Sequence, residues 1–91
     1  MVEVCSQADA LAMARAGADV LQLERFAAAA VATLRAGLQA AGLHPRLAPA
    51  GGVTLANAVD YARSGADLLI TSSPYFALPA DVKVRFLPHS T

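Results

Sequence analysis

The chain has 91 residues, of which 56% are hydrophobic and 15% are charged, and its formal net charge is zero. This balance argues against a nucleic-acid partner, because a phosphate backbone requires a basic face. No apolar run approaches the ~20 residues of a bilayer span and no signal peptide is visible, so we expect a small cytoplasmic protein. Cys5 is the single cysteine of the chain, and we interpret it as a buried free thiol.

Strands and helices alternate in the predicted element order. In chain order we expect a strand (2–5), a helix (6–16), a strand (19–23), a helix (26–41), a strand (46–49), a helix (54–64), a strand (67–71) and a short strand at Val82–Phe86. Alternating βα units indicate a parallel sheet. The predicted fold class is therefore α/β, and four strands suggest the C-terminal half of an incomplete TIM-like α/β barrel. An open doubly wound sheet is the alternative.

The domain division follows from the same pattern. Residues 1–86 are expected to form the C-terminal portion of the barrel, and residues 87–91 a flexible tail. The chain begins inside a strand, and an uncovered strand edge favours pairing with another chain. We therefore expect a homodimer or a higher oligomer.

An internal repeat supports the βα interpretation. The segments Ser6–Leu23 and Thr54–Thr71 align without a gap, and each begins with a hydroxyl residue suited to cap a helix. Gly17 and Gly65 are placed where each helix should end. The side chains expected on the buried helix faces are Leu11, Met13 and Ala14 in the first copy and Val59, Tyr61 and Ala62 in the second.

The pair Gly51-Gly52 lies between a predicted strand and a helix that begins near Thr54. Ligands of βα folds bind at the carboxyl ends of the strands, where glycine amides and a helix N-terminus can hold an anion. The sequence thus predicts a phosphate site without lysines, to which the next loop adds Thr71, Ser72 and Ser73. A simple turn is the alternative for a lone glycine pair.

Two carboxylates belong to the same predicted end of the sheet. Glu3 lies in the first strand, and Glu24 is expected directly after the second strand, followed by Arg25. Carboxylates here could bind ribose hydroxyls or a magnesium ion. The alternative for Glu24 and Arg25 is a solvated pair in a loop.

Several quoted segments resemble the C-terminal part of the quinolinate phosphoribosyltransferase family, also called nicotinate-nucleotide pyrophosphorylase. They are "VEV", "AGADVLQLERF" and "AGGVTLANAVDYARSGADLLITSSPYFALPADVKV", and the resemblance extends from Val2 to about Phe86. The ending "TSSPYFALPADVKV" is similar to the ModD branch, which is associated with molybdenum-transport operons.

The resemblance implies a dimeric transferase of NAD biosynthesis with an incomplete α/β barrel and a magnesium ion. Its substrates would be phosphoribosyl pyrophosphate and a pyridine-carboxylate-like acceptor. Glu3 and Glu24 match catalytic carboxylates, and Gly51, Gly52, Ser72 and Ser73 match phosphate loops. Glu24 is also the implied magnesium ligand.

The sequence departs from the family pattern at several positions. Arg25, Ala48, Ala50, Ser72 and Tyr75-Phe76 replace the residues that are usual in quinolinate enzymes. The acceptor is therefore not specified, and the chain alone is expected to be inactive because the family's acceptor-binding cations lie in other segments. Alternatives are a non-catalytic or vestigial anion-binding module linked to molybdenum transport, and another phosphate-binding barrel, such as a thiazole synthase-like or an indole-glycerol-phosphate-like enzyme.

Overall fold

The computed structural model describes residues 1–71, 79–82 and 84–88. Its elements in chain order are β1 (Val2–Val4), α1 (Gln7–Arg15), β2 (Val20–Glu24), α2 (Ala28–Ala40), β3 (Arg46–Ala50), α3 (Leu55–Arg63), β4 (Leu68–Thr71) and β5 (Arg85–Pro88). Each element expected before residue 72 is present, with ends shifted by one or two residues. The last strand begins and ends later than predicted, so residues 87 and 88 belong to β5 rather than to a tail.

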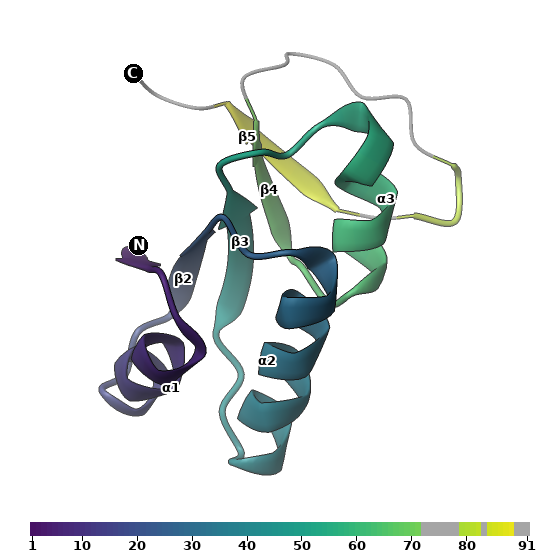
Figure 1. The fold of residues 1–91 in the computed structure, drawn as a ribbon. Helices are drawn as coiled ribbons and strands as arrows, with labels where there is room; N and C mark the ends of the chain where they lie inside the picture. The colour runs from purple at the N-terminus through teal and green to yellow at the C-terminus, as the bar shows by residue number, and fades with distance from the viewer. Residues whose placement is uncertain (72–78, 83, 89–91) are drawn as a thin grey trace.

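The strands are parallel and follow one another in space in chain order (Figure 1). β1, β2 and β3 form one ladder, and β4 pairs with β5 in a second. The two ladders meet where the Asp67 amide donates to the Leu47 carbonyl over 2.9 Å. The predicted α/β class with parallel strands is confirmed. The described strands do not close into a ring, so the barrel stays a prediction.

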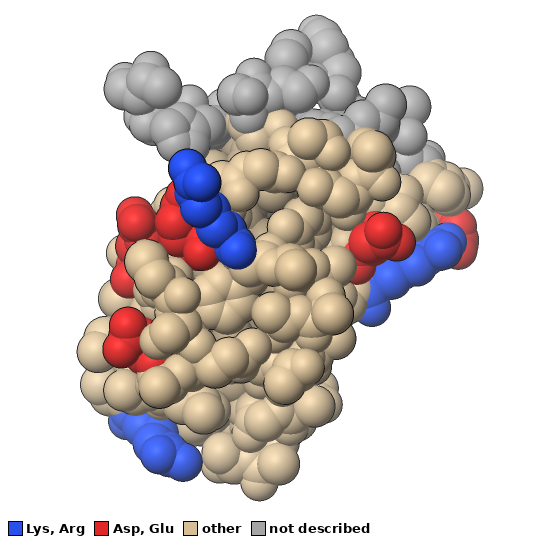
Figure 2. All heavy atoms as spheres, in the orientation of Figure 1, with Lys and Arg blue, Asp and Glu red and all other residues tan. Residues whose placement is uncertain are grey.

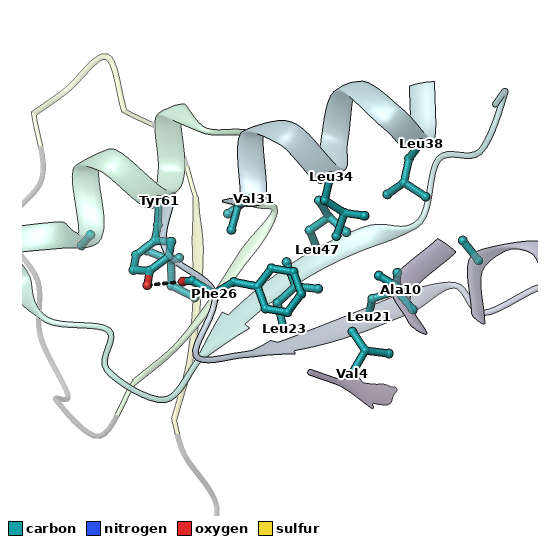
Figure 3. Packing of buried hydrophobic residues seen from close by; sticks show 14 residues of the cluster. Val4, Ala10, Leu21, Leu23, Phe26, Val31, Leu34, Leu38, Leu47 and Tyr61 are labelled. Carbon is teal, nitrogen blue, oxygen red and sulfur yellow. Dashed lines mark hydrogen bonds between the residues drawn. The ribbon is translucent and has the colours of Figure 1, made fainter. Parts of the chain in front are cut away.

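The three helices of the described residues all pack on one face of the strands (Figure 3). Side chains from alternate strand positions interlock there with the inner faces of the helices, which is the burial expected of a strand covered by helices. The largest fully buried side chains of this layer are Leu21, Leu23, Leu34, Leu38, Leu47, Leu69 and Val31.

The opposite face of the sheet carries a smaller apolar cluster made only of strand residues. Ala48, Ala50 and Ile70 are buried in it, and Val20, Leu68 and Leu87 pack around them. No described helix contributes to this cluster. Strand residues alternate between the two faces, so this uncovered face also receives Glu24.

The repeat in the sequence is a structural repeat. The Ser6 hydroxyl accepts from the Asp9 amide over 3.1 Å at the start of α1, and Thr54 caps α3 in the same way. Gly17 and Gly65 follow the two helices with φ of 98° and 108°, in the left-handed region that favours glycine. The predicted caps and glycine stops are confirmed.

Two predictions about burial were wrong. Cys5 is exposed, because β1 ends at Val4 and the chain has already left the sheet at the next residue. Met13 is 37% exposed, whereas Ala10 and Ala14 make the buried contacts of α1. These short alanine side chains let the helix approach the sheet closely, and Met13 is left on its flank.

The surface carries few charges. On the face drawn in Figure 2, charged side chains gather in small groups that large neutral areas separate, and no basic patch forms among the described residues there. Among those residues, no helix has the length and apolar character needed to cross a membrane.

Candidate functional site

The site begins where β2 and β3 end side by side. Glu24 is the last residue of β2 and is the ladder partner of Ala50, the last residue of β3. Immediately beyond them, the Arg25 amide donates to the Ala50 carbonyl over 2.9 Å. The two segments that leave the sheet are thus held together at its carboxyl edge, where ligands of βα folds bind.

Gly51 lies directly against the carboxylate of Glu24. A Cβ atom at position 51 would overlap Glu24 Oε1 and would lie 3.0 Å from Glu24 Cδ and 3.1 Å from Arg25 Cγ. Its φ of 73° also disfavours any residue with a side chain. The backbone conformation therefore favours glycine here, and a side chain at this exposed position would push the Glu24 and Arg25 side chains aside.

Gly52 has the opposite environment. Its φ is 106°, and nothing lies within 4 Å of the place that a Cβ would occupy. Among the described residues, no hydrogen bond engages the amides of Gly51 or Gly52. An open face with free amides beside a helix N-terminus is the arrangement that anion sites use.

The first turn of α3 holds the glycine loop in place. The Thr54 hydroxyl accepts from the Asn57 amide, the Asn57 Oδ1 accepts from the Thr54 amide over 2.7 Å, and the Asn57 Nδ2 donates to the Gly52 carbonyl over 2.8 Å. This capping box occupies two of the amides at the helix start. The amides left for an anion are therefore those of the loop itself and of the residues between the two box members.

Arg25 lies beside the site, and the sequence interpretation names it next to Glu24 without giving it a role there. Its side chain is 85% exposed, its Nε lies 3.8 Å from Glu24 Oε1, and its stem borders Gly51. Its φ of 59° is left-handed, which is uncommon for a residue other than glycine. Its position directly after a strand-ending carboxylate was the available signal. The predicted phosphate site without lysines thus has a cation beside it.

The other predicted site residues do not take part in this contact between Glu24 and the glycine loop. Glu3 is exposed in β1 and pairs in register with Gln22, two residues before Glu24 and on the same uncovered face. Thr71 ends β4, is 4% exposed, and lies on the face of Leu69, under the helices. Ser72 and Ser73 lie outside the described residues. The structure thus brings together Glu24, Gly51 and Gly52. Glu3 lies on the same face of the sheet, but in β1 and not at the carboxyl end of β2.

The carboxylate oxygens of the candidate site could bind magnesium only together with substrate phosphates and waters. Within the described ranges, no group of three or more His, Cys, Asp or Glu side chains could hold a metal ion. Mg²⁺ is usually bound by one or two carboxylates with substrate phosphates and waters, rather than by a protein cage. The carboxylate of Glu24, 29% exposed beside an open glycine loop, fits that mode.

A groove also lies at the other end of the strands, away from Glu24. It has a volume of about 580 Å³ and is lined by Arg46, Ala66, Asp67, Leu68, Val82, Val84 and Arg85. Most of these residues lie at or before the amino ends of β3, β4 and β5, whereas ligand sites of parallel α/β folds lie at the carboxyl ends. The fold therefore favours the edge at Glu24 over the groove.

The comparison with known families is decisive for identity. The family model described as "Quinolinate phosphoribosyl transferase, C-terminal domain" matches residues 1–85. The chain belongs to the quinolinate phosphoribosyl transferase family. The resemblance predicted from its motifs is confirmed.

Relatives of this quinolinate phosphoribosyl transferase domain carry the name "Putative pyrophosphorylase ModD". The protein of Escherichia coli O157:H7 is 38% identical over 88 residues, which cover 97% of the chain and 31% of the relative. That of Pasteurella multocida is 40% identical over 79% of the chain and 26% of the relative. That of Rhodobacter capsulatus is 49% identical over 71% of the chain and 25% of the relative. The chain thus spans about a third or less of these relatives, and no solved structure matches it.

Proposed function

We propose that this domain carries the phosphate side of the active site of a phosphoribosyltransferase-like enzyme. The donor is phosphoribosyl pyrophosphate, and the acceptor is a pyridine-carboxylate-like compound. The observation that carries the proposal is the contact of the Glu24 carboxylate with Gly51, next to the open amides of Gly52. Membership of the family supports the same class of chemistry.

The transfer follows from the charges involved. The acceptor nitrogen forms a bond to the anomeric carbon of the ribose, while the bond from that carbon to the pyrophosphate oxygen breaks and its electron pair leaves with pyrophosphate. With quinolinate, a carboxylate then leaves as carbon dioxide and a proton takes its place. The ribosyl carbon is cationic in the transition state, so a nearby carboxylate stabilises it.

The residues of this chain have separate parts in that scheme. The amides of Gly51 and Gly52 donate to phosphate oxygens, with the partial positive charge of the α3 N-terminus behind them. Glu24 holds the ribose hydroxyls or a magnesium ion, and Glu3 adds a second carboxylate on the same face. Magnesium, when bound, would neutralise charge that develops on the departing pyrophosphate.

The test uses the longest natural polypeptide that contains these residues. Millimolar phosphoribosyl pyrophosphate with magnesium should raise its melting temperature, because a ligand that binds only the folded state stabilises it. Gly51→Glu should abolish this rise, since the new side chain fills the loop. Gly42→Glu is the matched control: Gly42 has a φ of 74°, nothing within 4 Å of its Cβ position, and lies in the α2–β3 loop.

Each outcome has a clear meaning. Protection that is lost in Gly51→Glu and retained in Gly42→Glu supports the proposal. The absence of any shift in the unmodified protein refutes it. Protection without release of pyrophosphate, in the presence of pyridine carboxylates, would instead support the non-catalytic anion-binding alternative.

A further inference from the structure

Tyr61 makes a buried hydrogen bond to the loop that follows Glu24. Its hydroxyl donates to the Phe26 carbonyl over 2.5 Å, and both residues are buried, each with 7% of its surface exposed (Figure 3). The first backbone hydrogen bond of α2 is accepted by the Ala27 carbonyl, one residue later. The Phe26 carbonyl therefore lies outside the helix and depends on the Tyr61 hydroxyl, because a buried carbonyl needs a partner.

This bond connects the two halves of the candidate site. Phe26 is two residues beyond Glu24, and Tyr61 lies on α3, the helix whose first turn holds the glycine loop. Arg25 lies between Glu24 and Phe26, and its backbone amide donates a hydrogen bond to the Ala50 carbonyl. A left-handed residue such as Arg25 persists only where its surroundings determine its conformation. Here the two hydrogen bonds, one on each side, supply that constraint.

We propose that Tyr61 is a positioning residue, which sets the place of the Glu24 carboxylate against the glycine loop by holding the Phe26 carbonyl. The inference rests on the proposed function, since it assigns Tyr61 a part in that same site. Burial raises the pKa of the Tyr61 hydroxyl above its ordinary value of 10.0, so the group stays a neutral donor at physiological pH.

A purely structural tyrosine and a positioning tyrosine predict different binding data. Tyr61→Phe keeps the aromatic ring in the core and removes only the hydroxyl. If Tyr61 acts through Glu24, the variant loses the part of phosphoribosyl pyrophosphate affinity that depends on magnesium. Affinity without magnesium, which depends on the loop amides, stays the same.

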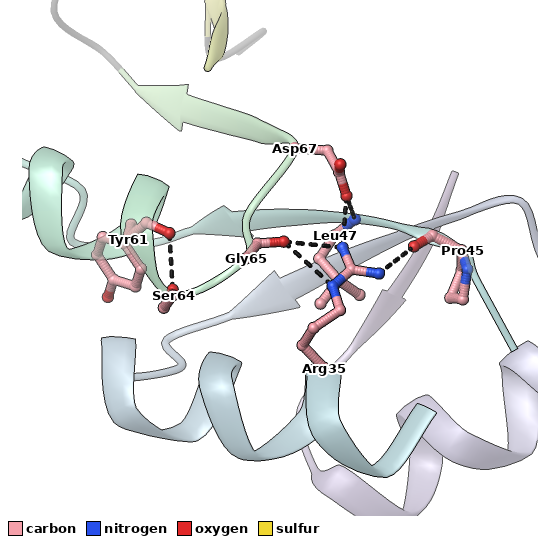
Figure 4. A network of polar contacts seen from close by, with 7 residues as sticks. All are labelled: Arg35, Pro45, Leu47, Tyr61, Ser64, Gly65 and Asp67. Carbon is pink, nitrogen blue, oxygen red and sulfur yellow. Dashed lines mark hydrogen bonds and ion pairs between the residues drawn. The ribbon is translucent and has the colours of Figure 1, made fainter. Parts of the chain in front are cut away.

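The experiment is calorimetric titration of the longest natural polypeptide with phosphoribosyl pyrophosphate, with and without magnesium. Tyr61→Phe should weaken the magnesium-dependent affinity about 10-fold, as outer-shell changes commonly do, and leave the magnesium-free affinity within about twofold. Ser64→Ala is the matched control, because Ser64 Oγ donates to the Tyr61 carbonyl over 2.6 Å and the substitution removes a hydroxyl hydrogen bond at the C-terminal end of the same helix (Figure 4). Ser64→Ala should leave both affinities unchanged.

A double-mutant cycle with Glu24→Gln isolates the coupling between the two residues. In the Glu24→Gln background, Tyr61→Phe should have no further effect on magnesium-dependent binding. An equal loss with and without magnesium, a loss that persists in that background, or no loss at all would overturn the assignment of Tyr61 alone. Failure of the unmodified protein to bind phosphoribosyl pyrophosphate would overturn the proposed function and this inference together.

Discussion

The carboxylate of Glu24 occupies the space that any side chain at Gly51 would need. The two residues lie on different strand ends, 27 positions apart in the sequence, and they meet because Glu24 and Ala50 are ladder partners. The two glycines of the pair therefore have different surroundings. Gly51 leaves room for the Glu24 carboxylate, whereas the space around Gly52 is open.

This difference predicts unequal effects of alanine at the two positions. Both substitutions are strained by a positive φ, but only Gly51→Ala also collides with a neighbour. We expect Gly51→Ala to lower the free energy of unfolding by up to about 0.5 kcal/mol more than Gly52→Ala, because the Glu24 and Arg25 side chains must move away from the new methyl group. Denaturant unfolding measures the difference. In a Glu24→Ala background the gap should close, and a gap of unchanged size would show that the Glu24 contact is not its cause.

The capping box of α3 gives a second prediction, with a control supplied by the repeat. Asn57→Ala removes the bonds to the Thr54 amide and the Gly52 carbonyl and should lower the free energy of unfolding by about 1 kcal/mol. It should also weaken binding of phosphoribosyl pyrophosphate, because the glycine loop loses its anchor. Asp9→Ala changes the equivalent position of α1, away from the site, and should leave binding intact. Equal binding in the two variants would contradict the role given to Asn57.

A third prediction concerns Arg35, which ties α2 to the amino ends of β3 and β4 (Figure 4). Its guanidinium donates to the Gly65 carbonyl over 2.8 Å, to the Pro45 carbonyl over 3.1 Å and to Asp67 Oδ2 over 2.6 Å. The Asp67 carboxylate also accepts from the Leu47 amide over 2.9 Å. The Arg35 side chain is 17% exposed. Its contacts hold the amino ends of β3 and β4 together, at the edge of the sheet opposite to the site.

Arg35→Ala should therefore lower the free energy of unfolding by about 2–3 kcal/mol, because charge-assisted bonds to two carbonyls are lost. Arg63→Ala is the matched control: its pair with Asp81 spans 3.4 Å between largely exposed side chains and should contribute less than about 0.5 kcal/mol. Denaturant unfolding of both variants compares them. Similar decreases in the free energy of unfolding would show that the Arg35 network stabilises the fold no more than the exposed Arg63–Asp81 pair does.

Local features of the fold could be predicted from the sequence. The helix ends follow from residues close in the chain: Ser6 and Thr54 cap, and Gly17 and Gly65 stop, each by interactions within one turn. Both copies of the repeat place an aspartate and an apolar run after the glycine, and this pattern predicts the apolar strands. Such signals depend on neighbours a few residues away, which the sequence displays directly.

The remaining features depend on contacts between distant residues. Which strand end Glu24 would meet depends on ladder register, and no pattern in the chain states that register. The Tyr61 ring was expected on a buried face, but the partner of its hydroxyl is 35 residues away. Cys5 was expected inside because cysteine is often buried, yet its position one residue past β1 decides its exposure.

The raised pKa of Tyr61 leads to a final prediction about alkaline pH. Burial favours the neutral phenol in the folded state, so the folded pKa lies above the unfolded value of 10.0. The contribution of this pKa difference to the free energy of unfolding is therefore fully present below pH 10. It decreases as the pH rises from 10 toward the folded pKa. Below pH 9, Tyr61→Phe should be less stable than the unmodified protein by about 1–3 kcal/mol, because the Phe26 carbonyl loses its donor. Above pH 10 this difference should shrink, since only the protein with Tyr61 has a phenol to ionise on unfolding. Denaturant unfolding of both proteins between pH 7 and pH 11 measures it, and a difference that is constant across that range would mean that Tyr61 titrates alike in the folded and unfolded chains.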